Sequence, residues 1–220
     1  MASSHALGPK PLRLGQPNIC DTLRVPIGEG KMTTIAAIQG DGWVVMGADT
    51  QSTVSEYKRL KMSNDKIIDN NGILIAGCGM GRGMDLMQKA WIAPKPRKSR
   101  MSVDELDRWM AKTFIPQMRQ LFIDGGYDMK DDGEYAQHEG AFIVAVQGVV
   151  FYIDDDYSFD REARGVTSSG SGGDFAAGSL YKKDLSTIEK AKKQMEIAID
   201  AAREYDVYSG GETRIYVQEA

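Results

Sequence analysis

Cysteine and histidine are scarce in this 220-residue chain, which contains only two of each. Cys20 and Cys78 give no disulfide framework, and together with His5 and His138 they do not supply a structural zinc site of the usual Cys/His type. His5 lies in a stretch without hydrophobic periodicity, and His138 lies near an acidic, turn-like segment. A Ser-His-Asp or Cys-His mechanism is therefore disfavoured. The low cysteine content fits a reducing, cytoplasmic compartment.

The chain also lacks long apolar runs and an excess of positive charge. No run approaches the roughly 18 apolar residues that a membrane span needs. A net charge of −4 and a pI near 5.3 offer no basic field for phosphate backbones. We therefore expect neither a membrane nor a nucleic acid as a partner. The length and the globular composition, with 42% hydrophobic and 26% charged residues, indicate one domain.

Residues 1–32 differ in sequence pattern from the rest of the chain. They show no hydrophobic periodicity and no apolar segment of the signal-peptide type. We expect them to be an N-terminal extension outside the fold, either a propeptide or a start assigned too early. The single domain is then expected to span residues 33–220.

Short apolar runs joined by turn residues predict antiparallel hairpins. An Asp-Gly turn and an Asn-Gly turn separate the first two pairs, and Gln147-Gly148 separates the third. The predicted hairpin strands are residues 34–39 with 43–48, 66–68 with 73–76, and 141–146 with 149–153. A final strand is expected over residues 213–217, and residues 165–173 are expected to form a Gly/Ser-rich loop.

Helical periodicity appears between these strands. One helix is expected from Met84 through Trp91, and a second begins at the capping box of Ser102 and is kinked or interrupted by Pro116. A short helix over 175–181 precedes a long one that opens with a second capping box at Ser186. Hairpin strands with grouped helices predict a layered α+β fold of antiparallel sheets with helices on the outer faces.

Thr33 begins the first predicted strand and follows Met32. A threonine at the start of a chain can use its own α-amino group, with a reference pKa of about 7.7–8.0, as the general base for its hydroxyl. Threonine is also a common strand residue, so Thr33 alone does not indicate a nucleophile. The residues expected near it distinguish a nucleophile from an ordinary strand residue. Asp49 ends the second strand and Lys66 begins the third, and a buried Lys-Asp pair would favour the alkoxide. The alternative for either charge alone is a surface salt bridge.

From Thr33 to Val217 the sequence resembles the threonine peptidases of proteasome β-subunit type, and most closely the bacterial HslV peptidases. The resemblance is carried by six segments in the family's order: Thr33-Thr34-Ile35, Gly47-Ala48-Asp49-Thr50-Gln51-Ser52-Thr53, Asn64-Asp65-Lys66-Ile67-Ile68, Ile75-Ala76-Gly77, Ser169-Gly170-Ser171-Gly172-Gly173, and Tyr205-Asp206 with Ser209-Gly210. It implies a four-layer αββα sandwich, in which helices flank two antiparallel sheets, as in N-terminal nucleophile (Ntn) hydrolases.

The same resemblance implies a role for each candidate site residue. Thr33 is the expected nucleophile, tuned by Asp49 and Lys66, and the backbone N–H of Gly77 is the expected oxyanion donor. Ser171 is expected beside the nucleophile, where Asp206 and Ser209 would support its amine. No cofactor and no metal are expected.

The implied function is a threonine endopeptidase that degrades unfolded polypeptides inside a chamber. The chamber is formed by two stacked homo-oligomeric rings, and an AAA+ unfoldase ATPase of the HslU kind is the implied partner. Two alternatives remain open: a non-proteolytic Ntn amidohydrolase, and a catalytically silent structural ring subunit.

The mechanism needs a free amine on Thr33, so residues 1–32 must be absent or removed. Gly28-Glu29-Gly30-Lys31 back-translates to a purine-rich stretch before the Met32 codon, which suggests a ribosome-binding site and translation from Met32. The competing interpretation is a propeptide cut autocatalytically after Met32. An unprocessed, inactive subunit is the third possibility.

Overall fold

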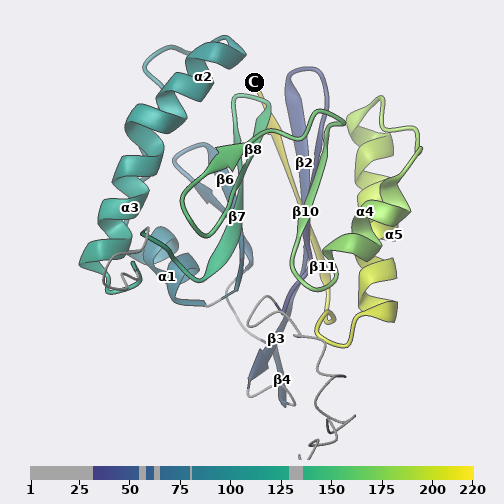
Figure 1. Ribbon diagram of the computed structural model, residues 1–220. Helices are drawn as coiled ribbons and strands as arrows, with labels where there is room; N and C mark the ends of the chain where they lie inside the picture. The colour runs from purple at the N-terminus through teal and green to yellow at the C-terminus, as the bar shows by residue number, and fades with distance from the viewer. Residues whose placement is uncertain (1–31, 55–57, 62–64, 80, 129–135) are drawn as a thin grey trace, which may run out of the picture.

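Figure 1 presents the computed structural model, which describes residues 32–54, 58–61, 65–79, 81–128 and 136–220. The expected N-terminal extension lies outside the described residues, except for Met32. The described elements are β1 (Ile35–Gln39), β2 (Trp43–Asp49), β3 (Gln51–Val54), β4 (Lys58–Lys61), β5 (Ile67–Asn70), β6 (Ile73–Gly79), α1 (Gly81–Lys89), α2 (Val103–Trp109), the π-helical segment η2 (Met110–Phe114), α3 (Ile115–Asp124), β7 (Gly140–Val146), β8 (Val149–Ile153), β9 (Phe159–Asp160), β10 (Val166–Ser169), α4 (Gly173–Leu180), α5 (Ile188–Tyr205) and β11 (Thr213–Glu219).

Two antiparallel sheets form the centre of the molecule. One has the strand order β10-β1-β2-β11 and the other has the order β5-β6-β7-β8-β9. Strands β3 and β4 form a separate hairpin that projects below the two sheets in Figure 1. Because β1 lies between β2 and β10, Ile35 is paired with both Ala48 and Ser169. This pairing brings the second strand and the Gly/Ser-rich segment to either side of the residue that follows Thr33 and Thr34.

Helices cover the outer face of each sheet, so the fold is a four-layer αββα sandwich (Figure 1). Three hydrophobic clusters separate the layers: one between α1–α3 and the β5–β9 sheet, one between the two sheets, and one beneath α4 and α5. Strand β1 contributes Ile35 and Ala37 to the middle cluster and Ala36 and Ile38 to the outer one. A strand that is buried on both faces has a continuous apolar sequence, so apolar and polar residues do not alternate along β1. The predicted α+β sandwich is confirmed.

The structure corrects several predicted boundaries. Helix α1 ends at Lys89 rather than Trp91, and six strands, not four, precede the first described helix. The segment expected as a Gly/Ser-rich loop contains strand β10, which pairs with β1. The side chain that caps α5 belongs to Thr187, which accepts the N–H of Lys190.

Pro116 has a local effect on the helix that contains it. It occupies the first turn of α3, where a missing N–H costs nothing. The turn before it is π-helical, and Ile115 donates its N–H to the Met110 carbonyl. The chain thus accommodates Pro116 by a wider turn and not by ending the helix. The predicted capping box at Ser102 is present, with reciprocal hydrogen bonds between Ser102 and Glu105.

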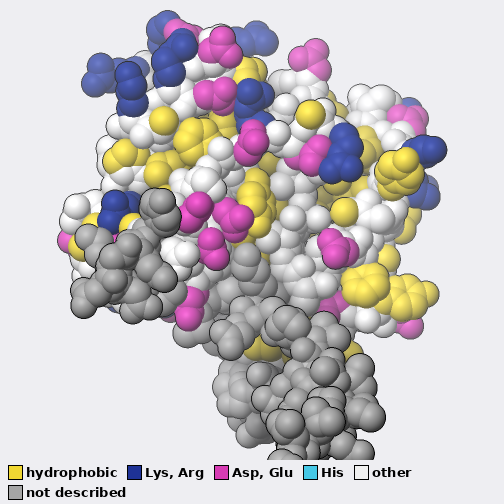
Figure 2. Space-filling model, in the orientation of Figure 1, with side chains coloured by type: hydrophobic (Ala, Val, Ile, Leu, Met, Phe, Trp, Pro, Cys, Tyr) yellow, Lys and Arg dark blue, Asp and Glu magenta, His cyan; other side chains and the backbone are white. Residues whose placement is uncertain are grey.

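Basic side chains gather on the surface over α2 in Figure 2. The segment before that helix contributes four exposed cations: Lys95, Arg97, Lys98 and Arg100. Of the helices in the described part of the chain, none is both long and apolar enough to cross a bilayer.

Candidate active site

Thr33 lies two residues before the first residue of β1 and is 4% exposed. Its backbone N–H donates to Ser171 Oγ at 3.3 Å, and its carbonyl accepts the N–H of Gly172 at 3.2 Å. Gly170 has a φ of +88°, and a Cβ there would overlap the Thr33 carbonyl. Glycine is required at this position because a side chain would be both strained and obstructed. The loop after β10 therefore wraps closely around Thr33.

Asp49 and Lys66 form an ion pair beside this loop. Lys66 Nζ lies 2.6 Å from Asp49 Oδ1, and the Asp49 side chain is fully buried. The carboxylate also accepts backbone N–H groups from Thr34 at 2.9 Å, Gln51 at 3.1 Å and Gly210 at 2.9 Å. Four donors satisfy the buried charge, which is the condition under which a buried carboxylate is tolerated.

Burial lowers the pKa of Lys66 below the ordinary lysine value of 10.5, and the attraction of Asp49 opposes this shift. Desolvation disfavours the charged form of an ammonium, whereas an adjacent carboxylate favours it. Lys66 is thus a cation whose proton is less tightly held than that of a surface lysine. Such a group can stabilise developing negative charge nearby.

A second hydrogen-bond chain approaches Thr33 from the loop after α5. Asp206 Oδ2 accepts Ser171 Oγ at 2.7 Å and Ser209 Oγ at 2.5 Å. Ser209 Oγ lies 2.6 Å from Thr34 Oγ1. Asp206 and Ser209 are both buried. The Ser171 hydroxyl, which donates to Asp206, accepts from the nitrogen of Thr33, so the carboxylate polarises it toward that nitrogen.

Gly77 lies in β6, two residues before its end, and faces Lys66, the residue that precedes β5. Its N–H donates to the Lys66 carbonyl at 3.3 Å. A Cβ at Gly77 would come within 2.7 Å of Met84 Sδ and 2.9 Å of the Phe142 ring. The candidate oxyanion donor thus has a long hydrogen bond to a backbone acceptor and no room for a side chain.

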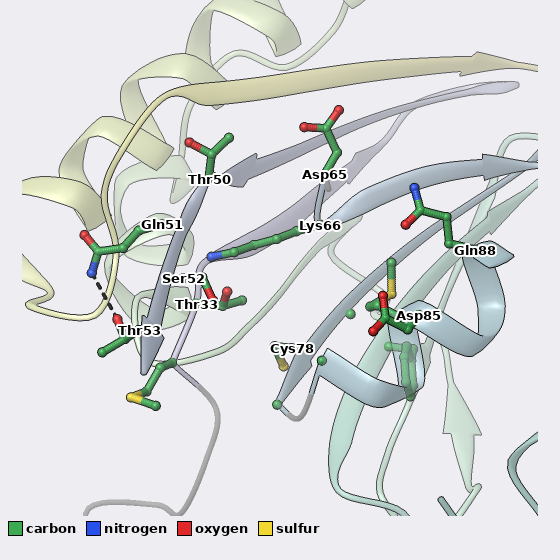
Figure 3. A pocket seen from close by; sticks show the side chains of 16 residues that line it. Thr33, Thr50, Gln51, Ser52, Thr53, Asp65, Lys66, Cys78, Asp85 and Gln88 are labelled. Carbon is green, nitrogen blue, oxygen red and sulfur yellow. Dashed lines mark hydrogen bonds between the residues drawn. The ribbon is translucent and has the colours of Figure 1, made fainter. Parts of the chain in front are cut away.

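A cavity of about 310 Å³ opens beside Thr33. Figure 3 shows Lys66 reaching into it toward Thr33, with β3 on one side and α1 on the other. Its wall includes Thr33, Lys66 and Gly77 together with Met32, Thr53, Cys78 and Asp85. Polar side chains of Thr50, Gln51, Ser52 and Gln88 line it as well, and Met84 and Phe142 add apolar surface. A concave site that combines apolar surface with convergent polar groups is typical of substrate binding.

The seven residues predicted from the sequence converge on one region. Thr33, Lys66 and Gly77 line the cavity, Asp49 is bound to Lys66, and Ser171, Asp206 and Ser209 form the chain that ends at the Thr33 nitrogen. None of them lies elsewhere in the fold.

Sequence reasoning assigned no role to Thr34, Gly172 or Gly210. Thr34 contacts both chains, through its N–H to Asp49 and its hydroxyl to Ser209. Gly172 packs so closely that a Cβ would overlap Thr34 Oγ1. Thr34 and Gly172 lay within segments that carried the family resemblance, but nothing in a single sequence distinguishes a buried contact from an ordinary strand or loop residue.

No group of three or more His, Cys, Asp or Glu side chains is placed to hold a metal ion in the part of the chain that the structure describes. The arrangement consists of a hydroxyl, a nitrogen, an ion pair and a backbone N–H. These groups are the components of covalent acyl transfer with a hydroxyl nucleophile.

Comparisons with known proteins give the fold. No family model matches the sequence, and no curated protein matches it. Solved structures do match, among them Thiobacillus denitrificans BPH at 17% identity and the same protein in complex with epoxomicin at 16%. Each has a TM-score of 0.64 and covers 85% of this chain and 98% of the other. HslV from Trypanosoma brucei matches at 24% identity and a TM-score of 0.57, covering 86% and 100%. The chain therefore shares the fold of HslV- and BPH-type proteasome-like structures, as the resemblance predicted.

Proposed function

We propose that this protein is a threonine endopeptidase of the Ntn-hydrolase type, with Thr33 as nucleophile and its own α-amine as general base. The observation that carries the proposal is the position of the Thr33 nitrogen, 3.3 Å from a Ser171 hydroxyl that Asp206 holds. Once residues 1–32 are absent, that nitrogen becomes an amine bound to the same hydroxyl. The amine is then oriented beside the Thr33 hydroxyl. Lys66, which is paired with Asp49, lines the same cavity and favours the alkoxide form of that hydroxyl.

In the proposed reaction Thr33 Oγ attacks a peptide carbonyl carbon and its proton passes to the α-amine. An ester bond forms as the scissile C–N bond breaks, and the proton goes to the departing amine. Water then hydrolyses the ester, again with the α-amine as base, and regenerates Thr33. Lys66 favours the alkoxide electrostatically, and the Gly77 N–H donates to the oxyanion in place of its long bond to the Lys66 carbonyl.

The likeness to HslV supports a proposal for the assembly. Two stacked rings of this chain would enclose the active sites, unfolded polypeptide would be the substrate, and an AAA+ unfoldase would deliver it in the cytoplasm. The domain is proposed to be residues 33–220. Either residues 1–31 are untranslated and Met32 is removed as the initiator, or residues 1–32 are removed as a propeptide.

The test compares proteins that differ only at residue 33. Expression from the Met32 codon, with intact mass and N-terminal sequencing, establishes whether Thr33 is the first residue. That form is expected to hydrolyse unstructured peptides, Thr33→Ser to retain activity, and Thr33→Ala to lose it by at least about 100-fold. Epoxomicin, which is bound in one of the BPH structures, is expected to bind the Thr33 form and not Thr33→Ala.

Peptide hydrolysis by Thr33→Ala would overturn the assignment. A protein with an exposed Thr33 that forms no rings and hydrolyses only small amides would instead be an amidohydrolase. Ring assembly without any hydrolysis would indicate a structural subunit.

A further inference from the structure

The segment that precedes α2 is basic, although the chain as a whole has a net charge of −4. It spans residues 94–100, has the sequence Pro-Lys-Pro-Arg-Lys-Ser-Arg, and is called the basic segment below. Its four cations are all exposed: Lys95, Arg97, Lys98 and Arg100. Figure 2 shows the densest gathering of Lys and Arg side chains on the visible face over α2. The basic segment thus forms a local positive surface on a negatively charged protein.

Two hairpin turns hold this segment against the fold. Ala93 lies directly before it, donates its N–H to Asn70 Oδ1 at 2.9 Å and accepts the side-chain amide of Asn71 at 2.8 Å. These asparagines lie at the β5–β6 turn. In the β7–β8 turn, Gln147 donates its side-chain amide to the Lys98 carbonyl at 2.8 Å. The backbone that carries the cations is therefore anchored near both ends.

Proline restricts the backbone of the segment further. Pro94 and Pro96 fix their own φ angles, and each disfavours the helical conformation at the residue before it. A surface whose backbone is already ordered loses less conformational entropy when a partner binds. The basic segment is thus a pre-organised surface and not a loose loop.

Most of the positive charge in this segment is not neutralised within the described part of the chain. Lys98 lies 2.6 Å from a carboxylate oxygen of Glu105. Lys95, Arg97 and Arg100 have no carboxylate within ion-pair distance among the described residues. Cations held close together repel one another, and a partner that brings negative charge relieves that repulsion.

The helix after the segment narrows the chemistry of the partner. The first turns of α2 carry three carboxylates: Asp104, Glu105 and Asp107. Nucleic acid has a dense, regular row of phosphates, some of which would lie against these carboxylates. In an acidic protein segment, neutral residues can separate the carboxylates, so that they pair with the cations and avoid α2. The mixture of charges therefore favours a protein partner.

We propose that the basic segment, residues 94–100, is a docking surface for an acidic segment of a partner protein, in which Asp or Glu residues are separated by neutral ones. The surface is separate from the candidate active site, because none of its residues is among the described residues that line the cavity beside Thr33. In Figure 1 the adjoining helix α2 lies at the end of the molecule away from the β3–β4 hairpin. The proposal does not depend on the proposed function.

The experiment measures binding of a fluorescein-labelled peptide, in which Glu alternates with Ser, to the 220-residue chain by fluorescence anisotropy. The test variant replaces the four cations of the basic segment by Gln. We expect its Kd to be at least about tenfold weaker than that of the parent protein, and the parent's affinity to fall with added salt. Circular dichroism checks that the fold is unchanged.

The matched control removes the same number of exposed cations elsewhere. It replaces four lysines near or on α5 by Gln: Lys182, Lys183, Lys192 and Lys193. Its Kd should change by less than about twofold. Equal weakening in the two variants would overturn the proposal, because it would show a general effect of net charge. Equal affinity of the parent for a peptide with Gln in place of Glu would also overturn it. Tighter binding of single-stranded DNA of equal charge would do so too, by favouring nucleic acid as the partner.

Charge reversal tests direct pairing. A variant with Lys95→Glu, Arg97→Glu and Arg100→Glu should bind a peptide in which Lys alternates with Ser at least about tenfold more tightly than the parent protein does. The same variant should no longer bind the Glu peptide. Failure to gain affinity for the Lys peptide would show that these three side chains do not contact the bound peptide, and would overturn the proposal.

Discussion

Thr34 Oγ1 and Ser209 Oγ lie 2.6 Å apart in the interior and join the start of β1 to the loop after α5. Ser209 also contacts Asp206, and the N–H of Thr34 donates to Asp49. One residue thus belongs to both hydrogen-bond chains that surround Thr33. The backbone of the candidate nucleophile is held from two sides, which pre-organises it for the proposed reaction.

Replacing Thr34 by Val should weaken this link without changing the volume greatly. The variant removes the hydrogen bond between Thr34 Oγ1 and Ser209 Oγ, whereas Ser209 keeps its bond to Asp206, so we expect a loss of about 0.5–1.5 kcal/mol in the free energy of unfolding. Urea denaturation followed by circular dichroism measures the change. Thr34→Ser, which retains the hydroxyl, is the control and should lose much less. Equal stability of Thr34→Val and the parent protein would contradict the importance of the contact.

Removal of the Asp49 carboxylate should be more costly. Asp49→Ala leaves Lys66 without its partner and the backbone N–H groups of Thr34 and Gly210 without their acceptor. A loss of about 3–5 kcal/mol in the free energy of unfolding is expected. Asp85→Asn, which affects a half-exposed pair, is the comparison and should change stability by less than about 1 kcal/mol. Similar losses in the two variants would argue against a special role for the buried pair.

Two glycine-to-alanine changes should have opposite effects. A Cβ at Gly172 would overlap Thr34 Oγ1, so Gly172→Ala must displace the strand start or the loop, and should reduce both stability and peptidase activity. Gly178 lies in α4 with no atom within 4 Å of a would-be Cβ. Gly178→Ala should therefore stabilise the protein by about 0.5–1 kcal/mol through helix propensity. Thermal melts and peptide hydrolysis of the two variants check both signs.

The pH dependence of kcat/KM should have two limbs. The α-amine of Thr33 must be neutral to accept a proton, so activity should rise with pH through its pKa, which is about 7.7–8.0 for an unperturbed amine. Lys66 must stay charged, so activity should fall as pH rises through its pKa. Because burial lowers the pKa of Lys66, that fall should begin below 10.5.

Lys66→Arg identifies the alkaline limb. An arginine remains charged throughout the accessible range, so any residual activity in this variant should show no decline at high pH. A decline at the same pH as in the parent enzyme would assign the limb to another group.

Hairpin strands were predicted well where their turns carry a strong local signal. The Asn70-Asn71-Gly72 segment is an example, since Asn71 and Gly72 both adopt the positive φ angles that the turn needs. Strand β10 was missed because residues 165–173 are rich in glycine and serine and do not by themselves indicate a strand. Its pairing with β1 stabilises the strand in the folded protein. The β3–β4 hairpin was missed for a similar reason, because its polar sequence has no core-facing pattern.

The sequence by itself determined the layered architecture and the identities of the candidate site residues. Both depend on local patterns, namely apolar runs with turn residues and short segments with a family likeness. Only the tertiary structure decided that Ser171 lies between Asp206 and the Thr33 nitrogen, that Thr34 joins two hydrogen-bond chains, and that Gly77 opens the cavity onto Met84. The first two relationships link residues far apart in the chain. They follow from the stacking of two sheets and the pairing of β1 with β10, which no local preference encodes.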